Sequence, residues 1–173
     1  MTETVVAIAD CRFPTIALVH GVCVGGGLEI AAACDLRFCS ESSRFGIPIN
    51  RLGLVMGYPE LQILIDIVGR SAALEILFEG RILGANEAKE MGLVNKVMPS
   101  SQLDKETYKI AKCIAAGAPL VARWHKKFAQ RLMKTEPLTQ AELDEVYDCY
   151  DTEDYLAGRQ AFLDKKTPKF NGR

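Results

Sequence analysis

The chain has 173 residues, of which 49% are hydrophobic, so it is long enough to bury the core of a folded domain. Its 21 Lys and Arg residues nearly balance its 22 Asp and Glu residues, which argues against nucleic acid or an anionic membrane surface as a partner. No apolar run approaches the roughly twenty residues that span a bilayer. Six cysteines without a Cys-x-x-Cys pair, beside only two histidines, argue against a zinc site.

The first residues contain no basic segment followed by an apolar one, so they do not resemble a secretory signal. Residues 7–11 are expected to end a helix. Cys23 and Cys34 lie in apolar surroundings, which is typical of small buried side chains in a reducing compartment. We therefore expect the protein in the cytoplasm or in an organellar matrix, mitochondrial or peroxisomal if the source is eukaryotic.

A run of three glycines follows the first predicted strand, residues 16–19. Gly25, Gly26 and Gly27 then begin a helix of small residues. The first N–H groups of a helix lack intrahelical partners and lie at the positive end of its dipole, which suits an anionic oxygen. Neither a Gly-Lys-Ser/Thr sequence nor the Gly-x-Gly-x-x-Gly spacing is present, so an oxyanion hole fits better than a phosphate site.

Glu29 lies three residues after Gly26, within the first helical turn. Its carboxylate can face whatever the glycine N–H groups hold, and it could move the acidic proton next to a polarised carbonyl. The alternative is that Glu29 merely complements the helix dipole. The spacing alone leaves both interpretations open.

The chain then changes from mixed strands and helices to helices alone. Strands are predicted at residues 36–40 and 43–47, joined by a polar turn and expected to pair. A loop at 50–59, helices at 60–68, 71–78 and 86–91, and an extended piece at 94–97 follow. Helices alone are predicted at 103–116, 120–133, 140–150 and 152–163. The succession of short strands and helices favours a ββα spiral over a doubly wound sheet.

Several motifs occur in one order along nearly the whole chain. They are residues 14–21, 24–29, 34–35, 44–48, 80–82, 92–97 and 161–166. Together they resemble the enoyl-CoA hydratase/isomerase, or crotonase, superfamily. Because they occur in register, they are more specific than the glycine run alone. The resemblance implies an α/β crotonase-like spiral in residues 1–98, followed by a helical oligomerisation module in residues 99–173.

The resemblance also departs from the family pattern in two ways. It begins well inside that pattern, so this chain looks like the C-terminal part of a crotonase, without the opening strands and the loop that provides the first oxyanion N–H. Hydratases of the family use two glutamates; Glu29 matches the first, while Ile49 stands at the second. A hydration reaction then lacks one of its two carboxylates.

The resemblance suggests further residues that contact substrate. Tyr58 lies in a segment that borders the acyl pocket in the family, where it could donate a hydrogen bond, although a packing role is the stronger alternative. Lys165 matches a basic position that can meet the phosphates of coenzyme A, and the alternative is a solvated lysine. The family also implies a homo-oligomer, a trimer or a dimer of trimers, with an acyl-CoA thioester as substrate and no cofactor beyond the coenzyme A of that substrate.

The sequence therefore predicts an acyl-CoA enzyme that stabilises a thioester enolate. Gly26 would bind the thioester oxygen and Glu29 would act as acid and base, with Gly25, Gly27 and Ile49 beside the substrate. Isomerase-like or hydratase-like chemistry on an enoyl-CoA is favoured, and decarboxylation of an acyl-CoA is a further alternative. The competing interpretation is a catalytically impaired or non-catalytic member that binds acyl-CoA or supports oligomerisation.

Overall fold

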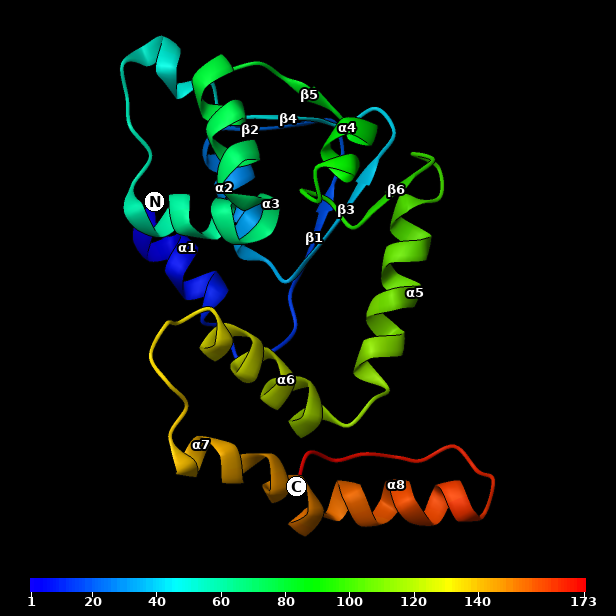
Figure 1. The fold of residues 1–173 in the computed structure, drawn as a ribbon. Coiled ribbons are helices and arrows are strands. Elements are labelled where there is room, and N and C mark those ends of the chain that lie inside the picture. Colours follow the sequence, from blue (N-terminus) through cyan, green and yellow to red (C-terminus); the bar gives the residue numbers. More distant parts are fainter. The chain divides into compact units, whose positions relative to one another are not determined.

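In the computed structural model, which describes residues 1–173, six short strands form two three-stranded sheets (Figure 1). The first sheet has the order β1-β3-β6, is parallel throughout, and consists of β1 (Ile16–Val19), β3 (Leu36–Ser40) and β6 (Lys96–Met98). The second has the order β2-β4-β5 and consists of β2 (Val22–Val24), β4 (Arg44–Gly46) and β5 (Leu83–Gly84). In it, β2 and β4 are parallel and β5 is antiparallel.

The chain visits the two sheets in turn, so a ββα unit occurs twice in succession. The first unit is β1, β2 and α2 (Gly26–Ala33), and the second is β3, β4 and α3 (Tyr58–Glu79). Corresponding strands pair in parallel, with Ile16 opposite Leu36 in one sheet and Val22 opposite Arg44 in the other. This is the spiral repeat that the sequence favours.

The expectation that the strands at 36–40 and 43–47 pair with each other is wrong. β3 and β4 belong to different sheets, because the chain turns a corner between them. Buried hydroxyl groups hold this corner. The Ser40 and Ser43 Oγ atoms are 2.8 Å apart, and Ser43 also donates to the Val19 carbonyl at 3.0 Å. The hydroxyls satisfy polar groups that the bend would otherwise leave buried without partners.

Two strands escaped the sequence analysis because they are very short. β2 follows β1 after only His20 and Gly21, and Gly21 adopts φ 68°, a left-handed conformation that favours glycine. β5 has two residues. The helices agree better with the pattern: α1 (Thr2–Ala9), α3 and α4 (Ala85–Glu90) lie where helices were expected. The helices predicted at 60–68 and 71–78 are the two parts of α3, which is broken at Gly69, a non-helical residue with φ 78°.

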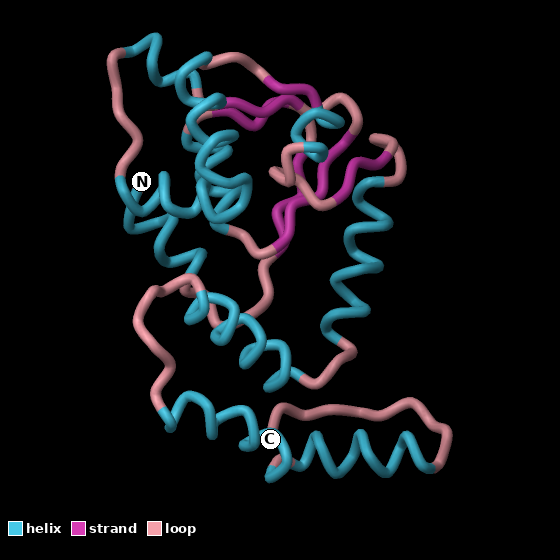
Figure 2. Tube along the Cα trace, viewed as in Figure 1, coloured by secondary structure: helices cyan, strands magenta, loops and turns pink.

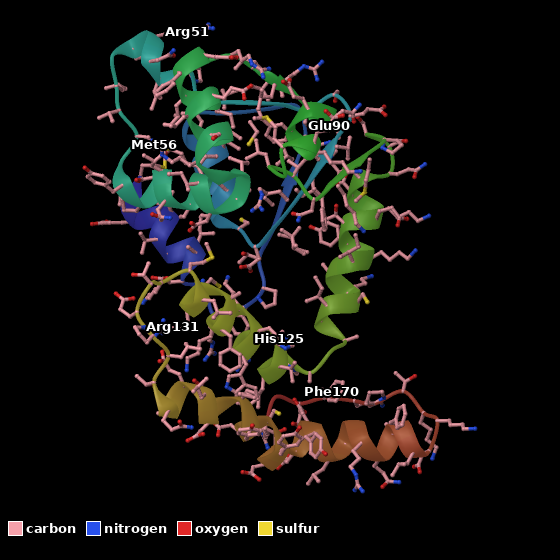
Figure 3. The ribbon with its side chains drawn as sticks, in the orientation of Figure 1. Arg51, Met56, Glu90, His125, Arg131 and Phe170 are labelled. Carbon is pink, nitrogen blue, oxygen red and sulfur yellow. The ribbon has the colours of Figure 1, made fainter.

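A single apolar cluster fills the space between these elements. Phe45 on β4 is fully buried, and it joins Leu28 from α2 with Leu64 and Ile76 from α3. Met56, labelled in Figure 3, lies just before α3, and its side chain is buried in the same cluster. The same core therefore holds β4, α2 and α3 together.

The chain divides into two units, unit 1 (Met1–Tyr108) and unit 2 (Lys109–Arg173). All the strands belong to unit 1, and unit 2 is helical (Figure 2). Its elements are the end of α5 (Leu103–Ala115), α6 (Pro119–Leu132), α7 (Gln140–Asp144), the 3-10 helix η2 (Glu145–Asp151) and α8 (Glu153–Leu163). The boundary that the sequence predicts after residue 98 stays a prediction.

Polar contacts organise unit 2. Thr139 and Glu142 form a capping box that begins α7. After α8 the chain returns beside it, where the carboxylate of Asp154 accepts hydrogen bonds from the N–H groups of Asn171 at 2.8 Å and Gly172 at 3.0 Å. Phe170, labelled in Figure 3, lies against Gly158 on α8. These contacts tie the end of the chain to the start of α8.

Candidate active site

The turn between β2 and α2 has a backbone conformation that requires glycine. Gly25 adopts φ 53° and ψ −128°, and its N–H donates to the Gly46 carbonyl at 2.9 Å. Its own carbonyl accepts from the N–H groups of Leu28 and Glu29 at 2.9 and 3.1 Å. The turn is therefore held between β4 and the first turn of α2.

The N–H groups of Gly26 and Gly27 are the first two of α2, and no acceptor in the chain pairs with them. Gly27 is exposed, and a Cβ added to it would meet nothing within 4 Å. A Cβ on Gly26 would lie 2.5 Å from the Cε of Met1, so the Met1 side chain covers this glycine. The turn offers two donors at a helix N-terminus, an arrangement that attracts an anionic oxygen.

Glu29 lies three residues after Gly26, about one turn along α2, and is partly buried. Burial raises the pKa of its carboxyl group, and the negative charge of Glu60 raises it further. The ammonium group of Met1 acts in the opposite direction. A carboxyl group whose pKa is raised toward the working pH is better suited to give and take protons.

Glu60 is the residue that the sequence analysis missed. It lies in the first turn of α3, is 5% exposed, and accepts a hydrogen bond from the Thr2 hydroxyl at 2.5 Å. That bond, followed by the N–H of Glu60 itself, lowers the pKa of the carboxyl group. One signal was available: Gly57 precedes Glu60 by three residues, as Gly26 precedes Glu29.

The structure brings the glycines and Glu29 together at the start of α2, and the other predicted residues lie on other elements. Ile49 is in η1 (Pro48–Leu52) and packs against the core. Tyr58 is the first residue of α3 and is 91% exposed, so it has no packing role within this chain. Lys165 follows α8 in unit 2, is exposed, and adopts φ 55°.

Other kinds of site find little support. No group of three or more His, Cys, Asp or Glu side chains is placed to hold a metal ion. Burial raises the pKa values of Cys23 and Cys39 to about 11, which keeps both thiols protonated and unreactive. None of the helices is both long enough and apolar enough to cross a membrane.

The arrangement as a whole combines two N–H donors with a carboxyl group one turn away. Donors of this kind stabilise negative charge that develops on a carbonyl oxygen, and an adjacent carboxyl group can move a proton on the neighbouring carbon. The fold around them is an α/β spiral in which successive ββα units stack. These are the parts needed for acid–base chemistry next to a carbonyl group.

The sequence pattern of the enoyl-CoA hydratase/isomerase family matches residues 1–173. A solved structure described as an enoyl-CoA hydratase/carnithine racemase from Magnetospirillum magneticum superposes with a TM-score of 0.96 at 48% identity, over 98% of this chain and 63% of that one. The chain belongs to the enoyl-CoA hydratase/isomerase family, and its α/β fold is the crotonase fold.

Relatives named for different activities are similar to this chain. A probable mitochondrial enoyl-CoA hydratase 2 of Arabidopsis thaliana is 37% identical over 169 residues, which is 95% of this chain and 56% of the relative. A peroxisomal Delta(3,5)-Delta(2,4)-dienoyl-CoA isomerase of the same plant is 42% identical over 121 residues, which is 69% of this chain and 44% of the relative. The chain thus spans about half the length of these relatives.

Proposed function

We propose that this chain binds an acyl-CoA thioester at the β2–α2 turn and stabilises the enolate formed from it. The N–H groups of Gly26 and Gly27 would hold the thioester oxygen, and Glu29 would move the proton on the neighbouring carbon. The reaction would be isomerase-like or hydratase-like, on an enoyl-CoA, with coenzyme A entering as part of the substrate.

One observation carries this proposal: two N–H groups without acceptors lie one turn from a carboxyl group whose pKa is raised. Hydrogen bonds from preorganised donors are worth most where negative charge develops, which in this reaction is the thioester oxygen. The raised pKa favours transfer of a proton from Glu29 to the enolate carbon. The names of relatives, which include both hydratases and an isomerase, are consistent with a thioester enolate as a shared intermediate.

We also propose partners and surroundings for the site. Tyr58 is exposed at the start of α3, where it could contact an acyl group, and Lys165 could meet the coenzyme A phosphates. Unit 2 exposes apolar side chains that a homo-oligomer, a trimer or a dimer of trimers, would cover. The names of plant relatives favour a mitochondrial or peroxisomal matrix if the source is eukaryotic, and the cytoplasm otherwise.

A second candidate is a member of the family that binds acyl-CoA or other subunits without catalysis. The observation that favours it is the Met1 side chain, whose Cε atom covers Gly26. The apolar Ile49, packed against the core, also leaves one family carboxylate position without a charge. If this candidate is right, Glu29→Gln would not change the binding of acyl-CoA.

Isothermal titration of the chain with acetoacetyl-CoA, whose enolate resembles the proposed intermediate, separates the two candidates. Glu29→Gln should weaken binding about tenfold, which is the scale of one hydrogen bond to a charged group. Turnover of enoyl-CoA isomers by the same variant should fall by about two to four orders of magnitude, as expected when a general acid–base is lost. Turnover assays with malonyl-CoA as a substrate test the decarboxylation alternative.

The matched control is Glu90→Gln, because Glu90 is an exposed glutamate at the end of α4 (Figure 3). This substitution removes the same charge from unit 1 away from the β2–α2 turn, so binding and turnover should stay at the level of the unsubstituted chain. If a folded chain does not bind acetoacetyl-CoA, the enolate proposal is wrong and the non-catalytic candidate replaces it.

A further inference from the structure

Glu60 has an oxygen atom that the chain itself does not satisfy. Its carboxylate is almost fully buried, and Oε1 accepts the hydrogen bond from Thr2, but Oε2 has no hydrogen-bond partner. A buried carboxylate oxygen without a partner is costly, so native structures pair such atoms with protein groups or with ordered water. The orphaned Oε2 therefore indicates a polar group that the chain does not supply.

The chain makes room for this oxygen at Gly57. A Cβ on Gly57 would lie 2.5 Å from Oε2 of Glu60, a distance that real Cβ atoms do not tolerate. The backbone of Gly57 has ordinary extended dihedrals, φ −66° and ψ 158°, so the glycine is not needed for its conformation. What it provides is space, which lets the carboxylate in this position fold back over the start of α3.

The same carboxylate belongs to the group of helices α1, α2 and α3 that also carries Glu29. The helices α2 and α3, which carry the two glutamates, pack against each other, and α1, which carries Thr2, packs against both. The negative charge of Glu60 is near enough to perturb the ionisation of Glu29. The two environments differ, because Glu29 is affected mainly by burial whereas Glu60 is stabilised as an anion by its hydrogen bonds. Two carboxyl groups whose pKa values are shifted in opposite directions can serve as an acid and a base.

We propose that Glu60 is the second catalytic carboxylate of this site, that its Oε2 binds the water molecule added to an enoyl-CoA, and that it accepts a proton from that water. This inference rests on the proposed function, because it requires an enoyl-CoA at the β2–α2 turn. It assigns to α3 the carboxylate that Ile49 cannot provide.

The step conserves atoms and charge. An O–H bond of water breaks and its proton moves to Glu60, while the water oxygen forms a bond to the β-carbon of the enoyl group. The π electrons of the C=C bond move toward the thioester oxygen, and the resulting enolate takes a proton from Glu29 at the α-carbon. Transfer of the proton from Glu60 to Glu29 restores both groups, so the net change is the addition of one water molecule.

Hydration of crotonyl-CoA by the full 173-residue chain tests this role, with acetoacetyl-CoA binding measured in parallel. Glu60→Gln keeps the shape of the side chain and an acceptor for Thr2, but it cannot take a proton. The hydration rate should fall about 100-fold or more, while acetoacetyl-CoA affinity stays within about threefold. Gly57→Ala, which displaces Oε2 without removing the charge, should also slow hydration, and Glu90→Gln should not.

The outcomes separate this inference from the proposed function. If the chain does not bind acetoacetyl-CoA, both fail. If it binds, and Glu29→Gln weakens binding, then hydration by Glu60→Gln at the rate of the unsubstituted chain overturns the role of Glu60 alone. Absence of hydration in the unsubstituted chain also overturns it and leaves isomerisation or decarboxylation as the candidate reactions.

A second measurement needs no turnover. The groups that face the pair are the Thr2 hydroxyl and the Met1 ammonium on α1, with Glu29 on α2 and Glu60 on α3. In a carbon-13 NMR titration, Glu60→Gln should lower the pKa of Glu29, because a neighbouring negative charge is lost. An unchanged pKa would show that the two carboxylates do not interact, and the pair would be ruled out.

Discussion

Units 1 and 2 are stabilised by different interactions. Unit 1 contains all the buried apolar side chains of the chain, and most of them gather in one cluster that includes residues of α2, β4 and α3. In unit 2 the single buried side chain is a carboxylate, Asp154, while many large apolar side chains are exposed. They include Leu132, Met133, Tyr147, Tyr150, Leu156, Phe162 and Leu163. Unit 1 therefore depends on its core, and unit 2 depends on polar contacts and on whatever covers its apolar surface.

The most destabilising change should be one that empties the core of unit 1. Phe45→Ala removes a fully buried ring from β4, and the lost burial together with the cavity should cost about 3–5 kcal/mol of unfolding free energy. Phe162→Ala in unit 2 removes the same ring from a residue that is 82% exposed, so it should change stability by less than about 0.5 kcal/mol. Urea unfolding followed by circular dichroism measures both.

Equal losses of stability from Phe45→Ala and Phe162→Ala would contradict the difference between units 1 and 2. If Phe162→Ala were as destabilising as Phe45→Ala in a sample shown by light scattering to be monomeric, unit 2 would have to bury Phe162. If the large effect of Phe162→Ala appeared in an oligomer alone, a second copy of the chain would be covering it. The oligomeric state is therefore measured on every sample.

An intermediate effect is expected from Asp154, the buried carboxylate of unit 2. Asp154→Ala removes the acceptor for the N–H groups of Asn171 and Gly172, and hydrogen bonds to a charged group contribute about 1.5–3 kcal/mol. Because the freed N–H groups can reach water at the end of the chain, the loss should be near the lower limit. Amide exchange at Asn171 and Gly172 should accelerate strongly, while the amides of β1 and β3 keep their protection.

Much of unit 1 could be predicted because its signals are local. The apolar runs at residues 16–19 and 36–40 coincide with β1 and β3, and the glycine run marks the start of α2. The strand β2 could not be found, because three residues carry no periodicity. Burial of Arg37 could not be expected either, because its guanidinium donates to the carbonyls of Cys34 and Leu93, partners that the fold brings together.

The candidate site also has a part that the sequence predicts and a part that it does not. Gly26 and Glu29 are three residues apart, so their relation follows from helix geometry alone. The neighbourhood of Glu60 depends on contacts between α1, α2 and α3, and its bond to Thr2 joins residues 58 positions apart. Sequence spacing predicts contacts within one helix, whereas packing of several helices decides which distant carboxylates meet.

The smallest effect should come from pH, acting on a partly exposed ion pair of unit 2. Glu142 accepts hydrogen bonds from the guanidinium of Arg131 on α6 (Figure 3) and from the N–H and hydroxyl of Thr139, and these contacts, led by Arg131, lower its pKa to about 2. A carboxyl group whose pKa is lowered from 4.5 stabilises the folded chain above pH 4.5 and loses that contribution as the pH falls toward 2. The contribution is modest because the pair is partly exposed to solvent.

In a carbon-13 NMR titration of the side chain carboxyl groups, Glu142 should therefore be among the last to take up a proton. Arg131→Gln should raise its pKa toward 4.5, because the charge and the hydrogen bonds of the guanidinium are lost. Thr139→Val should raise the pKa less, since it removes the hydroxyl but keeps the N–H that bonds to Glu142. If Arg131→Gln left the titration of Glu142 unchanged, the guanidinium would not contact this carboxylate, and the Arg131–Glu142 pair would not join α6 to α7.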